Sequence, residues 1–166
     1  LQVQPGLEGR QATRFYIRGQ GVGFGGAPPS VVTYFAEVPL DPNGGGTFAL
    51  NDLELVQVLR GPQGTLFGRN ANGGAVVLSP KAPGDKVEGF VDGTYGNYNY
   101  FQFKGAVTLP ISPTLSVRLS GSLSRRHGYT KNISGKDFDN LNDQSWRVYL
   151  RCQPSDSFQN DLFYNG

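Results

Sequence analysis

The chain has 166 residues, the length of one domain or slightly more. Hydrophobic residues make up 37%, charged residues 17%, and the net charge is +2, which argues against disorder and against nucleic-acid binding. A single cysteine, Cys152, excludes an internal disulfide and a thiolate metal cluster. No apolar run reaches the ~18 residues of a transmembrane helix. Because the chain begins at Leu1 and contains no methionine, we expect it to be an excerpt of a longer protein.

Residues 1–83 predict a loop-rich segment with short strands, in which glycine clusters separate the apolar runs. A short helical turn is expected at Asn51–Leu55, capped by Asn51 or Asp52. The composition of Lys81–Gly84 is typical of a boundary. The β-like runs are Arg14–Arg18, Val31–Val38, Leu55–Arg60 and Ala75–Ser79.

The segment Leu59–Val76, LRGPQGTLFGRNANGGAV, stands out in this half. Its many glycines predict a tightly turned loop between two strands. Part of it, Gly61–Gly68, lacks the Gly-Lys-Ser/Thr of a phosphate loop. Another stretch, Gly21–Gly26, fits GxGxxG, but a proline pair and a β-rich run follow where a dinucleotide site needs a helix. The residues therefore give no support for nucleotide binding.

The remaining motifs give no support for an enzyme or a metal site. His127 is the only histidine, so neither a Ser/His/Asp triad nor a histidine metal site can be built with confidence. Three aspartates of one polar loop have calcium-like spacing, but the glutamate of an EF-hand is missing. We therefore expect no catalytic residue, no metal and no cofactor. These aspartates are Asp137, Asp139 and Asp143.

Residues 84–166 change to nearly strict alternation of apolar and polar residues, which predicts β-strands. Four strands and a fifth at the C-terminal end are expected, joined alternately by short turns and by a long polar loop, 128–143. The strand ranges are Val87–Tyr95, Phe101–Leu109, Leu115–Arg125, Trp146–Cys152 and Phe158–Tyr164.

Two interpretations of this second half remain open. One is a soluble antiparallel sheet with one face on a core. The other is part of a transmembrane barrel, with apolar residues toward lipid, polar residues toward a hydrated lumen, and tyrosines near the first hairpin as an aromatic girdle. The charge on the polar face favours the barrel. Its basic members are Lys104, Arg118, Arg126, Arg147 and Arg151.

Three stretches together resemble the plug domain of TonB-dependent outer-membrane receptors. They are RFYIRG at Arg14–Gly19, VVTYFAEVPL at Val31–Leu40, and LNDLELVQVLRGPQGTLFGRNANGGAVVLSPKAP at Leu50–Pro83. The alternating segments that follow are similar to that family's first barrel strands. One departure is Ala36-Glu37, where the family often has Asp-Gly. The resemblance implies a mainly β chain: the mixed β plug, without its N-terminal part, at 1–83, and the first strands of an incomplete antiparallel barrel at 84–166.

The resemblance also implies a function, that of a transporter and not an enzyme. Such a receptor lies in the outer membrane of a Gram-negative bacterium, contacts outer-membrane lipid, and takes up a scarce nutrient with energy delivered by the TonB protein. The usual ligands are ferric siderophores, haem, cobalamin or oligosaccharides. The TonB box would precede Leu1 and most barrel strands would follow Gly166. A receptor that also signals, and a soluble β-rich binding or adhesion module, remain alternatives.

The resemblance further implies roles for individual residues. Arg18 and Arg60 match the plug arginines that pair with barrel glutamates and lock the plug in place. Ligand contacts are expected in two plug loops that reach the outer vestibule, where glycine lets a bulky ligand approach the backbone. These candidates are Phe24, Gly25, Gly26, Asn43, Gly44, Gly45, Gly46, Thr47 and Phe48.

Overall fold

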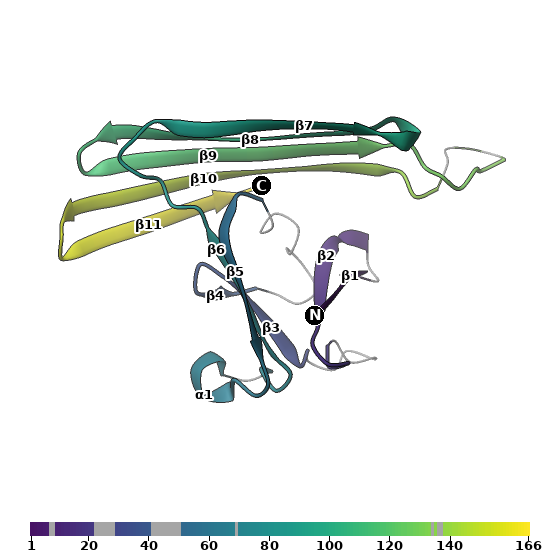
Figure 1. The fold of residues 1–166 in the computed structure, drawn as a ribbon, viewed down its shortest axis with the longest axis horizontal. Coiled ribbons are helices and arrows are strands. Elements are labelled where there is room, and N and C mark those ends of the chain that lie inside the picture. The colour runs from purple at the N-terminus through teal and green to yellow at the C-terminus, as the bar shows by residue number, and fades with distance from the viewer. Residues whose placement is uncertain (7–8, 22–28, 41–50, 69, 134, 136–137) are drawn as a thin grey trace. The chain divides into compact units, whose positions relative to one another are not determined.

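A computed structural model describes residues 1–6, 9–21, 29–40, 51–68, 70–133, 135 and 138–166 (Figure 1). The chain forms two compact units, Leu1–Lys81 and Ala82–Gly166. Among the described residues, strands dominate both units, and each helical element is a single turn.

The first unit contains a mixed sheet in the order β4-β3-β6-β5. Its central strands, β3 (Val31–Phe35) and β6 (Gly74–Pro80), are parallel to each other. The outer strands, β4 (Val38–Pro39) and β5 (Leu53–Arg60), pair antiparallel to β3 and β6 respectively. The β-branched and aromatic residues of these strands suit a pleated surface that is partly buried. The fold class expected from the sequence, mainly β with a mixed sheet first, is confirmed here.

A small hydrophobic core holds the first unit together. It combines Val76 and Leu78 of β6 with Val31 and Phe35 of β3, and all four side chains are buried. Ile17, which follows β2, is buried with them in the same unit. Strands β1 (Gln2–Gly6) and β2 (Gly9–Tyr16) form a separate antiparallel pair.

Several features of this unit differ from the sequence expectations. The run predicted at Val31–Val38 is divided into β3 and β4 by a turn at Ala36–Glu37. Strand β1 was not expected, because Gln2–Gly6 has too few apolar residues to show an alternating pattern. The segment Asn51–Leu55 forms a bend followed by the start of β5 and not a helical turn, because pairing with β6 gives its backbone hydrogen-bond partners. The glycine-rich loop contains one helical turn, α1 (Gly64–Phe67), where a tightly turned loop without a helix was predicted.

The second unit is a five-stranded antiparallel meander in which every strand pairs with its neighbours along the chain. Short turns join β8 to β9 and β10 to β11 at one end, where residues 113–114 and 156–157 lie. At the other end are the β7–β8 hairpin, with the 3₁₀ turn Asn97–Asn99, and the long connection 127–140 (Figure 1). The five strands are β7 (Glu88–Gly96), β8 (Tyr100–Ser112), β9 (Leu115–Arg126), β10 (Leu141–Ser155) and β11 (Phe158–Asn165).

Candidate functional site

The glycine-rich segment between β5 and β6 closes into a compact loop. Its ends are joined by backbone hydrogen bonds from Gly61 to Gly73 at 3.2 Å and from Gln63 to Ala71 at 2.9 Å. Gly74 has a φ of 144°, and a Cβ there would collide with the carbonyl oxygen of Leu59. Only glycine combines this backbone conformation with such a close approach. The glycines of this loop are therefore required by its packing.

The Arg18 turn lies against the same glycines. Ile17 and Gln20 exchange two backbone hydrogen bonds, at 2.8 and 3.0 Å, so Arg18 and Gly19 form a two-residue turn. Arg18 has a positive φ of 52°, which is uncommon for a residue with a side chain and fits the first position of a type I′ turn. The side chain of Ile17 lies close to Gly74. The turn thus presents an exposed arginine while its neighbour is anchored in the core.

Arg60 lies at the same place in the first unit, because it is the β5 residue that pairs with Gly74. Its side chain is exposed, as is that of Arg18. The structure therefore brings both predicted lock arginines to the surroundings of one glycine. The predicted ligand-contact candidates, Phe24–Gly26 and Asn43–Phe48, lie outside the described residues.

Helix α1 is attached to the sheet by one aromatic residue. The hydroxyl of Tyr34 on β3 donates a hydrogen bond of 2.9 Å to the carbonyl of Phe67, and the two rings pack edge to face at 5.0 Å. Nothing in the glycine-rich motif signalled this contact, because Tyr34 lies 33 residues earlier in the chain.

In the second unit, the strand register separates polar from apolar residues onto two faces. Pairs that lie opposite one another on the polar face include Lys104 with Ser122, and Arg118 with both Thr108 and Tyr149. The even-numbered residues of β8 and β9 share this face, as do the odd-numbered residues of β10 and β11. The basic residues predicted for one face therefore do share it, as the register of β8–β10 requires.

The most buried ionic group of the polar face is Arg118, whose side chain is 2% exposed. Its Nη1 donates a hydrogen bond of 2.7 Å to the hydroxyl of Thr108 and lies 3.7 Å from a carboxylate oxygen of Glu88. Because an unpaired buried charge is strongly unfavourable, this network fixes the register of β7, β8 and β9. The alternating pattern predicted the face of Arg118 but not its partners.

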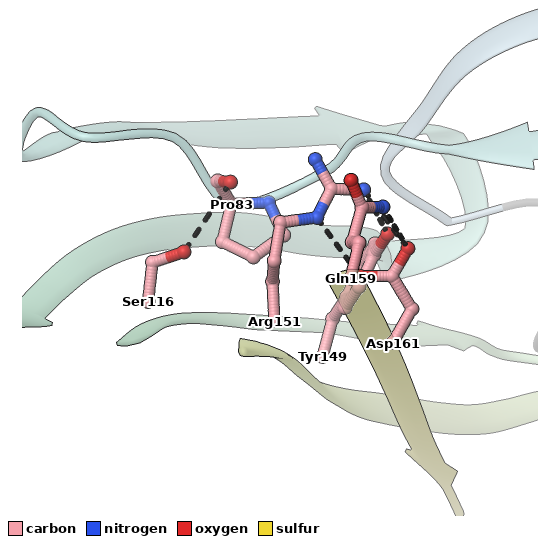
Figure 2. Close-up of polar contacts among 6 residues, drawn as sticks. All are labelled: Pro83, Ser116, Tyr149, Arg151, Gln159 and Asp161. Carbon is pink, nitrogen blue, oxygen red and sulfur yellow. Dashed lines mark hydrogen bonds and ion pairs between the residues drawn. The ribbon is translucent and has the colours of Figure 1, made fainter. Parts of the chain in front are cut away.

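A second network lies nearer the short-turn end, on β10 and β11 (Figure 2). Arg151 makes a forked pair with Asp161: Nε donates to Oδ1 at 2.8 Å and Nη2 donates to Oδ2 at 3.0 Å. Nη2 also donates to the Tyr149 hydroxyl at 2.8 Å, and Gln159 donates to Asp161 at 2.7 Å. Both carboxylate oxygens of Asp161 accept hydrogen bonds within this cluster, so its geometry is that of a structural ion pair between β10 and β11.

The segment that leads into β7 is held on the same face. The Ser116 hydroxyl donates a hydrogen bond of 3.4 Å to the carbonyl of Pro83 (Figure 2). Pro83 precedes the first strand of the meander, so this bond attaches the start of the second unit to the beginning of β9. A hollow of about 450 Å³ beside it is lined by residues of the short turn and by Arg151.

The opposite face of the second unit is apolar and exposed. Four consecutive rows across the strands carry mainly Val, Leu and aromatic side chains together with glycine. The large exposed side chains of this face include Val91, Tyr95, Phe101, Phe103, Leu109, Leu119, Trp146, Leu162 and Tyr164.

The described residues offer no catalytic arrangement. They contain no group of three or more His, Cys, Asp or Glu that is placed to hold a metal ion. Among them, no helix combines the length and apolar character needed to cross a membrane. What the second unit does provide is a sheet that is charged on one face and apolar on the other.

Comparison with known proteins supplies the family context. Residues 1–75 match the model of the TonB-dependent receptor plug domain. The pesticin receptors of Yersinia enterocolitica and Yersinia pestis are 34% identical over 132 residues. That match covers 77% of this chain and 19% of the receptor, so the chain spans about a fifth of the length of the curated relatives it matches.

Solved structures show the same fold. The crystal structure of the ferric yersiniabactin uptake receptor FyuA from Yersinia pestis matches with a TM-score of 0.75 and 25% identity, over 88% of this chain and 23% of that one. The pyoverdine outer membrane receptor FpvA from Pseudomonas aeruginosa, bound to pyoverdine, matches with a TM-score of 0.72 and 16% identity, over 93% of this chain and 22% of that one.

Proposed function

This chain belongs to the TonB-dependent outer-membrane receptors, and we propose that the receptor it comes from takes up a ferric siderophore across the outer membrane. The members of this family are transporters and receptors, not enzymes. In this proposal, residues 1–83 are the C-terminal part of the plug, and residues 84–166 are the first strands of the barrel.

The observation that carries the proposal is the two-faced sheet that directly follows the plug segment in the chain. A membrane-spanning barrel needs strands that alternate between a lipid-facing apolar side and a lumen-facing polar side. The meander β7–β11 has this alternation, with Arg118 and Arg147 on one face and Leu119 and Val148 on the other. A soluble sheet with one face on a core would have to cover the exposed apolar face.

The ligand class is proposed from the relatives. One of them is a receptor for ferric yersiniabactin and another was solved with pyoverdine bound, so a ferric siderophore is favoured over haem, cobalamin or an oligosaccharide. The energy would come from the TonB protein through a segment outside this chain. Five strands leave two open sheet edges, so the chain by itself should not form a transport pathway.

Uptake by the full-length receptor tests this function. The receptor is expressed in a Gram-negative host that lacks its own siderophore receptors, and the host is supplied with radiolabelled ferric yersiniabactin or ferripyoverdine. We expect iron accumulation that depends on both the receptor and TonB. Equal accumulation with and without TonB, or accumulation of neither siderophore, would contradict the proposal.

We further propose that Arg18 and Arg60 lock the plug to barrel glutamates in the complete receptor. The support is that both side chains are exposed near Gly74 and that a guanidinium forms forked hydrogen bonds with carboxylates. Replacing one partner of a buried ion pair costs roughly 3–5 kcal/mol. The Arg60→Ala variant of the receptor should therefore show faster proteolysis of the plug and greater leakage of small solutes through the pore. Unchanged proteolysis and leakage would refute the lock.

The ligand-contact role of Phe24–Gly26 and Asn43–Phe48 is a proposal of the same kind. It rests on the family resemblance and on the density of glycine in both loops. Removing Asn43–Thr47 from the receptor should weaken binding of ferric yersiniabactin or ferripyoverdine while leaving barrel assembly intact. Affinity equal to that of the unmodified receptor would dismiss this assignment.

A further inference from the structure

We propose that the apolar face of β7–β11 carries a site for one phosphorylated lipid of the outer membrane's outer leaflet. Arg125 binds the phosphate, and a hollow over Gly105 and Gly121 receives an acyl chain. The inference rests on the proposed function, because it requires this face to lie against lipid.

Arg125 is an exception on its face of the sheet. The register places it between Phe101 on β8 and Asn142 on β10, in a row that continues to Tyr95 on β7. Along β9 it has the same orientation as Leu119 and Leu123, so its guanidinium stands on the apolar side. The side chain is exposed. A charge on this face is unfavourable at the bilayer midplane but is accepted at the interface, where aromatic side chains also gather.

The surroundings of Arg125 suit an anion. It borders an open hollow of about 690 Å³ at the loop end of the strands, which is also lined by Arg126 of the polar face and by Asn99, His127 and Asn142. None of the described residues that line this hollow carries a carboxylate. Asn99 and His127 are held together by a contact of 3.3 Å between Nδ2 and Nδ1. The guanidinium of Arg125 can donate to this hollow the forked hydrogen bonds that phosphate oxygens accept.

An apolar hollow lies further along the same face, toward the middle of the strands. It measures about 570 Å³, and its floor is Gly105 of β8 beside Gly121 of β9, which are direct partners in the register. Larger side chains form its walls, among them Val91, Phe103 and Leu119. The hollow exists because the two glycines lack side chains. Its lining is mainly apolar, so it fits a hydrocarbon chain better than a polar ligand.

The spacing connects the two hollows. Arg125 and Gly121 are four residues apart on β9, which corresponds to about 13 Å along a strand. Only one row, with Phe103 and Leu123, lies between the Arg125 row and the glycine pair. A single amphiphile with its phosphate at Arg125 and a chain over the glycines spans this distance. A soluble anion would occupy only the hollow beside Arg125. A protein partner would not explain why a single positive charge lies one row away from a single apolar hollow.

The direction of the strands indicates which leaflet of the membrane the lipid belongs to. Arg125 lies at the end of the meander that carries the long connection 127–140, while the short turns are at the other end (Figure 1). In outer-membrane barrels the long loops are extracellular and the short turns are periplasmic. The lipid in question therefore belongs to the outer leaflet, where lipid A carries phosphates on a multiply acylated disaccharide.

Native mass spectrometry of the delipidated full-length receptor tests the site, with monophosphorylated lipid A and the same acylated disaccharide without phosphate as probes. The unmodified receptor should prefer the phosphorylated form. Arg125→Gln should lower its affinity about tenfold and remove the preference, since a charge-assisted hydrogen bond is worth roughly that much. Arg125→Lys should retain most of the affinity, which guards against a folding defect. Gly121→Val, which fills the apolar hollow, should weaken both lipids equally.

Lys104→Gln is the matched control, because it removes one positive charge from the polar face of the same sheet. It should bind both lipids as the unmodified receptor does. The lipid site is refuted if Arg125→Gln binds normally, or if Lys104→Gln loses as much affinity. Insertion and ferric siderophore uptake are measured on the same variants. Normal uptake with unchanged lipid binding overturns this inference alone, whereas a receptor that does not insert overturns the proposed function as well.

Discussion

The two units of the chain are organised in opposite ways. The first unit buries Val76 and Leu78 in an ordinary hydrophobic core. The second unit buries Arg118 and Arg147, at 2% and 3% exposure, and leaves Val91 and Leu162 exposed at 75% and 61%. Hydrophobic burial drives the folding of a unit in water, whereas a sheet in lipid is stabilised with its apolar face outward. The comparison therefore separates a part that folds by its core from a part that, in the proposed function, has lipid against its apolar face.

The largest effect is expected from Gly74→Val in the first unit. A side chain at this position meets the Leu59 carbonyl, and the backbone φ of 144° disfavours any residue except glycine. The combined clash and strain should cost roughly 3 kcal/mol or more. Limited proteolysis of the full-length receptor should then cut the plug at lower protease concentration while the barrel stays resistant.

Gly64→Ala provides the matched control for this prediction. A Cβ at Gly64 has no heavy atom within 4 Å, and the residue begins α1. Its proteolysis should equal that of the unmodified receptor. Equal sensitivity of the two variants would mean that the close approach at Gly74 does not hold the loop together.

The next effect tests the exposed face of the second unit. Leu119→Arg puts a charge on the apolar side of β9, which should cost about 2–4 kcal/mol near the bilayer midplane. Thr94→Arg places the same side chain on the polar face, at an exposed position of β7. Heat-modifiable migration of the extracted receptor should show less folded barrel for Leu119→Arg and a normal amount for Thr94→Arg. The opposite ranking would reverse the assignment of the two faces.

A smaller effect is expected from Thr108→Val, which removes the acceptor of the 2.7 Å hydrogen bond from Arg118. Both side chains are buried, so the guanidinium loses an acceptor that water cannot readily replace. The loss should be about 2 kcal/mol, seen as a lower thermal unfolding temperature of the receptor in detergent. Thr94→Val, at an exposed position, should change the temperature little. A drop of the same size in both variants would show that the hydroxyl matters for strand propensity and not for Arg118.

Much of the second unit was predictable because the patterns that define its strands and turns each lie within a short stretch of sequence. Alternation at period two is visible within each strand, and short turns at Pro113 and Asp156 fix which strands are neighbours. The number and order of the five strands and the shared face of the basic residues are therefore as expected. Strand β10, however, begins at Leu141, inside the predicted loop 128–143, and not at Trp146. The partners of Arg118 and Arg151 were not, since a register shift of two residues changes the partners and keeps every side chain on the same face.

The first unit was less predictable because its contacts are distant in sequence. The parallel pairing of β3 with β6 joins residues more than forty positions apart, and Tyr34 reaches Phe67 across a similar gap. The motif around Gly74 identified a tight loop but not what it packs against. The positive φ of Arg18 is set by the hydrogen bonds of its turn, which the residue type alone would disfavour.

The smallest effect concerns the Arg151–Asp161 pair, whose side chains are about one quarter exposed. A double-mutant cycle with Arg151→Gln and Asp161→Asn should give a coupling of roughly 1 kcal/mol, because partial solvation weakens an ion pair with good geometry. Salt should reduce the coupling. The pair Lys104→Gln with Asp161→Asn, on strands that are not neighbours, should be additive. A coupling several times larger would mean that this network is shielded from solvent in the complete barrel. The polar face would then resemble the core of the first unit more than a hydrated lumen.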